Sequence, residues 1–367
     1  MTVTTESGAS PAPGRPKAGE PPSGGRLRYA ATGGQAVAKA SFDWKPVALV
    51  LGLMLAGWPL VGSTSTWLTL TMAGLAMGMI IFIIASGLTL VFGLMDVLNF
   101  GHGVFIALGA YLATSVFALM SGWTTSPELW RNLVPLFATM LVAMSLAAAV
   151  GWAFERVLVR PVYGQHLKQI LITMGGMIIG EELIKVVWGT TPISIEMPEA
   201  LRGVVTFAAG ADRAAFEKYR IFATLVGLVV LAVMLFTLNR TKLGLLIRAG
   251  VQDREMVEAL GYRIRRLFVG VFVAGSALAG LGGALWGVYQ HGVLPQIGSH
   301  VNVLIFIVII IGGLGSTMGC LIGALLIGLL ANYTGFVAPK VAMFSNIGLM
   351  VLVLLWRPQG LYPVANR

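Results

Sequence analysis

Residues 67–95 read WLTLTMAGLAMGMIIFIIASGLTLVFGLM and contain no charged side chain. A hydrocarbon core about 30 Å thick requires about 20 mostly apolar residues in one helix, so this run is long enough to cross a membrane with some tilt. The rest of the chain has the same character: of its 367 residues 57% are hydrophobic and 11% are charged. Its mean hydropathy is +0.84. Because an ordinary soluble domain has about 25% charged residues, the sequence predicts an all-α membrane protein.

Further apolar runs predict a polytopic helical bundle. They cover residues 47–63, 104–120, 133–154, 169–188, 221–238, 267–289, 301–339 and 341–356. The stretch Gly312-Gly313-Leu314-Gly315-Ser316 interrupts the run 301–339. Since hydropathy does not separate re-entrant pieces from full crossings, we expect about eight transmembrane helices with broken or re-entrant segments in a membrane domain at 45–363. Residues 1–44 are rich in Gly, Pro, Ser and Ala, which predicts a disordered cytoplasmic tail.

The loops between the apolar runs predict an orientation with both termini inside the cell. The loop 239–266 should face the cytoplasm, because basic residues outnumber acidic ones there and cytoplasmic loops are enriched in Lys and Arg. Its basic residues are Arg240, Lys242, Arg248, Arg254, Arg263, Arg265 and Arg266, against Asp253, Glu255 and Glu258. The segment 189–220 balances its charges and is expected outside. The net charge of +10 is thus explained by loops beside an anionic leaflet, and no nucleic acid partner is expected.

A polar stretch breaks the chain after Asp96, where Asn99-Phe100-Gly101-His102-Gly103 separates two apolar runs. Irregular backbone at membrane depth is tolerated only where protein or a wet cavity satisfies its polar groups. We therefore expect Asn99 and His102 either to line a substrate route or to have structural roles. In the structural alternative, Asn99 caps the next helix and His102 bonds to a neighbouring span.

Two carboxylates lie unusually deep in the run 169–188. Glu181 and Glu182 are about 20 Å from its start near Lys168, at 1.5 Å per residue. Lys185 follows Glu181 by four residues, which predicts a helical ion pair. Glu182 is then expected to face the bundle interior or an outer vestibule, where it could meet an ammonium group.

The remaining motifs favour packing over catalysis. Gly275, Ala279, Gly283 and Gly287 share one helical face, which predicts close packing of helices in lipid. The four histidines are scattered, and nothing matches the phosphate-binding pattern GxxxxGK[ST]. Cys320 is the single cysteine, so no intrachain disulfide or cysteine metal cluster is expected. Residues 249–261 are expected to form a short charged helix ended by Gly261, serving as a solvated connector or as a docking surface for a soluble partner.

The run GLTLVFGLMDVLNFGHG at residues 87–103, continuing to Leu108-Gly109-Ala110-Tyr111, resembles the opening of branched-chain amino-acid ABC permeases of the LivH type. The stretches 155–161, 252–261 and 356–361 agree with the same family. At one position the chain departs from this pattern: the relatives often have Ala before the histidine, whereas this chain has Gly101. That difference is expected to loosen the break and to alter the substrate route.

The resemblance implies a non-catalytic permease subunit of an ABC importer in the bacterial cytoplasmic (inner) membrane, which moves branched-chain or related amino acids. It implies a second homologous permease subunit, two cytoplasmic ATP-binding subunits and a periplasmic solute-binding protein as partners. No cofactor or metal is expected in this chain, because the partner subunits bind ATP. The expected substrate-pathway residues are Asn99, Gly101, His102 and Glu182. The expected ATPase-coupling residues, in the loop 239–266, are Gln252, Asp253, Arg254, Glu255, Glu258 and Gly261.

Other functions remain open at this point. Within the family the substrate could instead be urea, a short amide or an aromatic acid. An ion-coupled secondary transporter would need unpaired acidic or histidine side chains at mid-membrane, and few residues besides His102 and Glu182 qualify. A membrane-embedded enzyme would need a clustered nucleophile and base or paired metal ligands, and the sequence pattern offers none.

Overall fold

A computed structural model describes residues 44–126, 128–209, 212–252 and 254–363. The predicted tail, residues 1–44, lies outside the described residues except for the exposed Trp44. The helices are α1 (Lys45–Val61), α2 (Thr64–Met95), α3 (His102–Leu119), α4 (Ser121–Thr124), α5 (Leu129–Phe154), η1 (Glu155–Val159), η2 (Arg160–Val162), α6 (His166–Trp188), η3 (Glu199–Leu201), α7 (Lys218–Arg240), α8 (Lys242–Gln252), α9 (Arg254–Ala259), α10 (Ile264–Tyr289), α11 (Ile297–Gly312), α12 (Thr317–Val337) and α13 (Pro339–Trp356). The strands are β1 (Ile193–Ser194), β2 (Val204–Ala209), β3 (Asp212–Glu217) and β4 (Gly292–Val293).

The protein is an all-α polytopic membrane protein, as the sequence predicts. Among the described residues, six helices are long and apolar enough to cross a membrane: α2, α3, α7, α10, α12 and the continuous helical stretch Trp130–Val162, which contains most of α5. Three shorter apolar segments, Lys45–Val61, Ile297–Gly312 and Phe344–Trp356, accompany them. Helix α6 is as long as α7 but includes Lys168, Glu181, Glu182 and Lys185. The number of full crossings and the orientation of the termini stay predictions.

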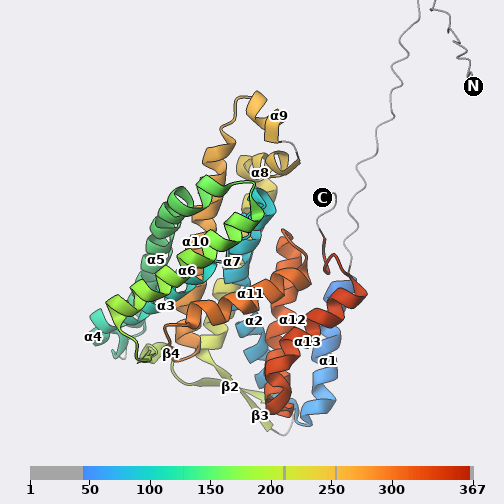
Figure 1. Ribbon diagram of the computed structural model, residues 1–367. Helices are drawn as coiled ribbons and strands as arrows, with labels where there is room; N and C mark the ends of the chain where they lie inside the picture. The colour runs from blue at the N-terminus through green and yellow to red at the C-terminus, as the bar shows by residue number, and fades with distance from the viewer. Residues whose placement is uncertain (1–43, 127, 210–211, 253, 364–367) are drawn as a thin grey trace, which may run out of the picture. The chain divides into compact units, whose positions relative to one another are not determined.

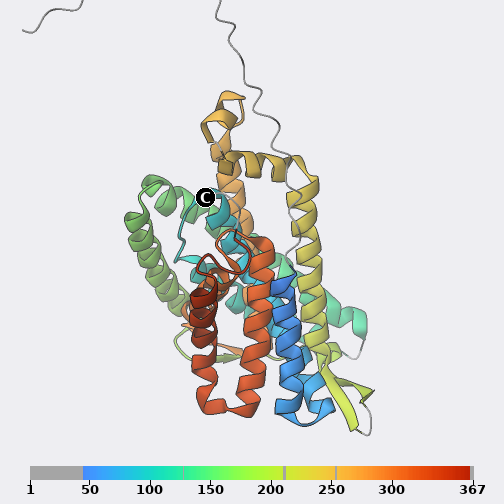
Figure 2. The ribbon, with the colours of Figure 1, turned by 90° about the vertical axis from the view of Figure 1, so that its right-hand side faces the viewer.

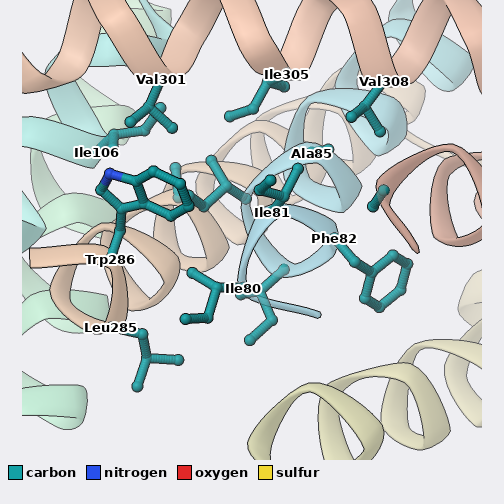
Figure 3. Packing of buried hydrophobic residues seen from close by; sticks show 14 of the residues in the cluster. Ile80, Ile81, Phe82, Ala85, Ile106, Leu285, Trp286, Val301, Ile305 and Val308 are labelled. Atoms are coloured by element: carbon teal, nitrogen blue, oxygen red, sulfur yellow. The ribbon is translucent and has the colours of Figure 1, made fainter. Parts of the chain in front are cut away.

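Helix α2 forms the centre of the bundle. Every residue from Met79 to Ala85 is buried, although consecutive residues of a helix point in all directions. A helix that is apolar all round is surrounded by other elements. Figure 3 shows this packing, with Ile80, Ile81 and Ala85 among side chains from the neighbouring helices, including Leu285 of α10 and Ile305 of α11. The charge-free run that predicted a membrane span is therefore also the core of the fold.

Glycines allow the neighbouring helices to approach the backbone of α2 and α3. A Cβ on Gly275 of α10 would meet the carbonyl oxygen of Gly87 at 2.7 Å, and a Cβ on Gly283 would overlap the backbone of Ile106. On α12, a Cβ on Gly328 would overlap the backbone of Gly74. The predicted packing role of these small residues is confirmed.

The bundle has two structurally different ends. Helices α8 and α9 lie at one end, and the hairpin formed by β2 and β3 lies at the opposite end (Figures 1 and 2). The hairpin pairs Val204 with Glu217 through to Ala209 with Asp212, in antiparallel register. A second antiparallel pair, β1 with β4, joins the segment after α6 to the segment after α10. Sequence reasoning did not predict either pair, because these strands are short and lack a clean apolar alternation.

Candidate functional site

The predicted break between α2 and α3 is confirmed and folds back along α2. Helix α2 ends at Met95, Asp96 takes a left-handed conformation with φ 52°, and α3 begins at His102. The His102 Nε2 lies 3.2 Å from the carbonyl oxygen of Ile84. Since Ile84 is eleven residues before Met95, His102 sits about 16 Å back from the end of α2 at 1.5 Å per residue. The non-helical segment therefore reaches the depth of the apolar core.

Two other helices hold this segment in place through Phe100. Its backbone N–H donates to the Thr173 Oγ1 of α6 at 3.2 Å. Its carbonyl oxygen accepts from the Asn302 Nδ2 of α11 at 2.8 Å. The Phe100 ring also stacks on Phe306 of α11, with centroids 4.6 Å apart. Helices α6 and α11 thus supply the hydrogen bonds that water supplies to irregular backbone elsewhere.

Unpaired polar atoms gather around the break. Asn99 and His102 are each 1% exposed. Neither polar atom of the Asn99 side chain has a partner among the described residues, and the same is true of the His102 Nδ1 and the Asn302 Oδ1. An unsatisfied buried donor or acceptor costs about 1–3 kcal/mol. The partner of such an atom can be an ordered water molecule, a polar ligand or a group brought near by a second conformation.

The two structural alternatives for these residues have different outcomes. Gly101 occupies the N-cap position of α3 and no side chain caps this helix, so the prediction that Asn99 is an N-cap is wrong. The prediction that His102 bonds to a neighbouring span is confirmed by its contact with Ile84 of α2. The Asn99 side chain lies beside Gly101 at the start of α3 but makes no hydrogen bond among the described residues.

Gly101 does not loosen the break, contrary to the expectation from the sequence. Its backbone has an ordinary conformation, with φ −71°. A Cβ at Gly101 would overlap the Phe154 ring and lie 3.1 Å from the Asn99 Oδ1. The ring of Phe154 takes the space that a methyl group would need, and the segment is closely packed.

An aromatic cluster surrounds this ring and was not predicted. Phe154 of α5 stands edge to face with Phe105 of α3 at 5.5 Å and stacks on Phe272 of α10 at 6.3 Å. His102 packs edge to face against the same Phe105, with ring centroids 6.0 Å apart. Three helices therefore fix the position of the histidine ring.

The ion pair on α6 differs from the predicted one. Lys185 pairs with Glu182, with Nζ and Oε1 2.6 Å apart, whereas the sequence favoured Glu181. The Glu181 Oε1 instead accepts a hydrogen bond of 2.6 Å from the Ser299 Oγ of α11. Residues three and four positions apart on a helix are both close enough to pair, so Lys185 could pair with Glu182 or with Glu181. The hydrogen bond from Ser299 holds the Glu181 carboxylate, and Lys185 pairs with Glu182. The Glu182 side chain is 62% exposed and lies on the surface of the chain, not beside Asn99 and His102.

The predicted ATPase-coupling residues lie in and directly after helices α8 and α9. This part of the chain, the coupling segment, packs near the end of α2. Helix α9 ends at Ala259, and Gly261 has φ 86°, which confirms that the helix terminates there. Val257, Ile264 and Phe268 form a buried cluster against which Met95 packs. Met95 is the last residue of α2. The residue that directly precedes the break therefore packs on a cluster to which α9 contributes Val257 and α10 contributes Ile264 and Phe268.

The outer face of this segment is exposed. Glu255 and Glu258 are exposed on α9, together with Met256 at 58% and Leu260 at 68%. Gln252 and Arg254 lie at the facing ends of α8 and α9, and Asp253 lies outside the described residues. A surface that mixes exposed apolar and acidic side chains at one end of a membrane protein suits the binding of a soluble partner.

The polar centre of the site has no pattern of metal ligands. Among the described residues, no three His, Cys, Asp or Glu side chains come together in a group that could hold a metal ion. Cys320 is free and buried in α12. The unpaired atoms of Asn99, His102 and Asn302 leave hydrogen-bonding groups at this centre that a small polar ligand could use.

Comparison with known proteins decides the family. The model of the family described as "Branched-chain amino acid transport system / permease component" matches residues 70–355. The chain belongs to this permease family. It is 30% identical to the high-affinity branched-chain amino acid transport system permease protein BraD of Pseudomonas aeruginosa, over 78% of this chain and 93% of that protein. It is 28% identical to LivH of Salmonella typhimurium, over 78% and 92%. No solved structure matches the chain significantly.

The chain is also similar to the high-affinity branched-chain amino acid transport system permease protein LivM of Escherichia coli K12, with 28% identity over 87% of this chain and 75% of that protein. The family match covers the break, α6, the coupling segment and α11. It leaves out residues 1–69, which contain α1 and the predicted tail. Sequence reasoning missed Thr173, Asn302 and Phe154 as parts of the site. A polar side chain inside an otherwise apolar span, as at Asn302, is a signal that could have found one of them.

Proposed function

We propose that this permease is the membrane-spanning subunit of an ABC importer that moves branched-chain or related amino acids across the bacterial inner membrane. One observation carries the proposal: a buried, polar, non-helical segment at membrane depth directly follows Met95, which packs on the cluster that Val257 of α9 forms with the start of α10. A change at α8 and α9 therefore reaches the break through direct contacts. Discontinuous helices of this kind form substrate sites in many transporters.

The relatives support one part of the proposed assembly, the pairing of two permeases. Their names include two permease proteins, LivH and LivM, of one amino acid transport system, which supports pairing with a second homologous permease. In the proposed importer, a periplasmic binding protein delivers substrate and two cytoplasmic subunits bind and hydrolyse ATP. This chain itself performs no catalysis and holds no cofactor. ATP binding shifts the populations of two permease states, which requires different affinities of the motor for those states.

The proposal assigns roles to the two sets of residues. Asn99, Gly101 and His102 lie along the substrate pathway, and Glu182 contributes at the outer vestibule once the second permease is in place. Gln252, Asp253, Arg254, Glu255, Glu258 and Gly261 couple the permease to the ATPase. About eight crossings with both termini inside place α8 and α9 on the cytoplasmic side, where the motor is.

Charge reversal on α9 tests the coupling role. Glu255 is exposed, so Glu255→Lys is expected to leave insertion and folding intact while uptake falls at least about tenfold, the effect of losing about 1.4 kcal/mol at an interface. Uptake of labelled leucine and ATPase activity are measured in proteoliposomes that contain the whole complex. Lys340→Glu is the matched control, because Lys340 is exposed in the first turn of α13, at the opposite end of the bundle. Unchanged uptake in Glu255→Lys would remove the coupling assignment.

A further inference from the structure

A hollow of about 480 Å³ opens beside the first turns of α11. It lies between the end of α10, the paired strands β1 and β4, and the middle of α2. Its size is in the range of small-molecule sites, which span about 300–1,000 Å³. Nothing in the family match or in the break assigns a role to it.

The walls of the hollow are mainly apolar. Met77 of α2, Trp286 of α10, and Val301 and Leu304 of α11 line it. Figure 3 shows Trp286 beside the side chains of α2, and Val301 on the helix that runs above them. Apolar walls with a few polar groups are typical of sites that bind a ligand by its hydrocarbon part.

The polar lining consists of uncharged or weakly basic groups. Ser194 of β1, Gln290 at the end of α10 and His300 of α11 contribute side chains. Among the described lining residues there is no Asp, Glu, Lys or Arg. A mainly apolar lining without charged side chains suits the hydrocarbon side chain of a ligand. The charged ammonium and carboxylate groups of an amino acid would stay with the polar lining groups or with water, because burial of an unpaired charge is costly. A ligand such as urea, which has no hydrocarbon part, would leave these apolar walls unused.

Helix α11 separates the hollow from the break. Its residues Val301 and Leu304 face the hollow. On its other side, Asn302 donates to the carbonyl oxygen of Phe100, and a Cβ on Gly103 would meet the carbonyl oxygen of Gly298 at 2.8 Å. A ligand in the hollow would therefore contact the same helix that holds the break.

We propose that this hollow is a transit site for the aliphatic side chain of a neutral amino acid, and that Leu304 with Trp286 limits the size of the side chain that passes. This inference rests on the proposed function and adds the place where the permease itself selects among substrates. Leu304 is the more useful residue for a test, because it is only partly buried, whereas Trp286 is part of the core.

The test compares Leu304→Phe with Val303→Phe in proteoliposomes that contain the whole complex. Val303 is 61% exposed on α11 and does not line the hollow, so it receives the same substitution at a matched position. Uptake of labelled leucine and labelled alanine is measured with the same binding protein in every sample. The preference of the binding protein is then the same throughout and cancels when the leucine-to-alanine ratio of a variant is compared with that of the wild type. Leu304→Phe is expected to lower the leucine-to-alanine ratio at least about tenfold, since a single methylene in a hydrophobic pocket gives about 10–200-fold discrimination and the leucine side chain has three more carbon atoms than that of alanine. Val303→Phe is expected to leave the ratio unchanged.

A second variant acts in the opposite direction. Leu304→Ala enlarges the hollow and is expected to raise phenylalanine uptake relative to leucine uptake, which misfolding would not do. The proposal is overturned if both Leu304 variants keep the wild-type ratios, or if Val303→Phe changes the ratio as much as Leu304→Phe does. A wild-type complex that takes up no amino acid would instead contradict the proposed function.

Discussion

Gly101 and Phe154 share one small volume at the start of α3. Because a Cβ at Gly101 would overlap the Phe154 ring, the glycine allows the ring to pack between the break and α6. A Cβ on Gly176 of α6 would likewise lie 2.7 Å from the same ring. The family resemblance drew attention to Gly101, but the sequence did not show which side chain occupies the space beside it. A residue 53 positions away occupies that space.

Adding that methyl group tests the packing at the break. Gly101→Ala is expected to destabilise the folded chain by about 1–3 kcal/mol, as overpacking of a core does. Thermal unfolding of the detergent-solubilised complex measures the effect. Gly335→Ala is the control, because a Cβ at Gly335 in α12 meets nothing within 4 Å. The double variant Gly101→Ala with Phe154→Leu should recover part of the loss, and a Gly101→Ala complex as stable as wild type would contradict this account.

Helices pack through glycine wherever α10 and α12 meet α2. The approach of α10 to α2 depends on Gly275 against Gly87. Gly275→Leu is expected to force these helices apart and to reduce the yield of folded complex, which size-exclusion chromatography and thermal unfolding both report. Gly270→Leu on the same helix serves as the control, since Gly270 is exposed and a Cβ there meets nothing within 4 Å. Equal losses from both variants would show that the contact with α2 is not what matters.

The elements themselves could be predicted from the sequence better than their contacts. Apolar runs located the membrane helices, and glycine and polar residues located both breaks, because these signals are local. The hydrogen bond from the Asn302 side chain to the Phe100 carbonyl oxygen was not predicted, since the two residues are 202 positions apart in the sequence. The partner of Lys185 was predicted wrongly, because the competing bond from Ser299 to Glu181 comes from another helix. Local patterns specify helices, whereas tertiary contacts decide which polar groups pair.

The end of the bundle that carries α8 and α9 can bind the ATPase subunits only if it faces the cytoplasm. Labelling of introduced cysteines in intact cells tests this, in a Cys320→Ala background. Tyr262→Cys, at a residue 53% exposed between α9 and α10, is expected to react only with membrane-permeant maleimides. Glu196→Cys, where the side chain is 82% exposed, is expected to react with impermeant ones as well. The reverse pattern would place the coupling segment outside the cell and contradict the proposed function.

Uptake by the purified complex tests the central claim most directly. Proteoliposomes that contain this chain, the second permease and the ATPases are supplied with binding protein and labelled leucine. The account predicts uptake that requires ATP on the side of the membrane that carries the ATPase subunits. This uptake should be insensitive to collapse of proton and sodium gradients. Uptake by the permease chains alone, driven by an ion gradient without ATP, would contradict it.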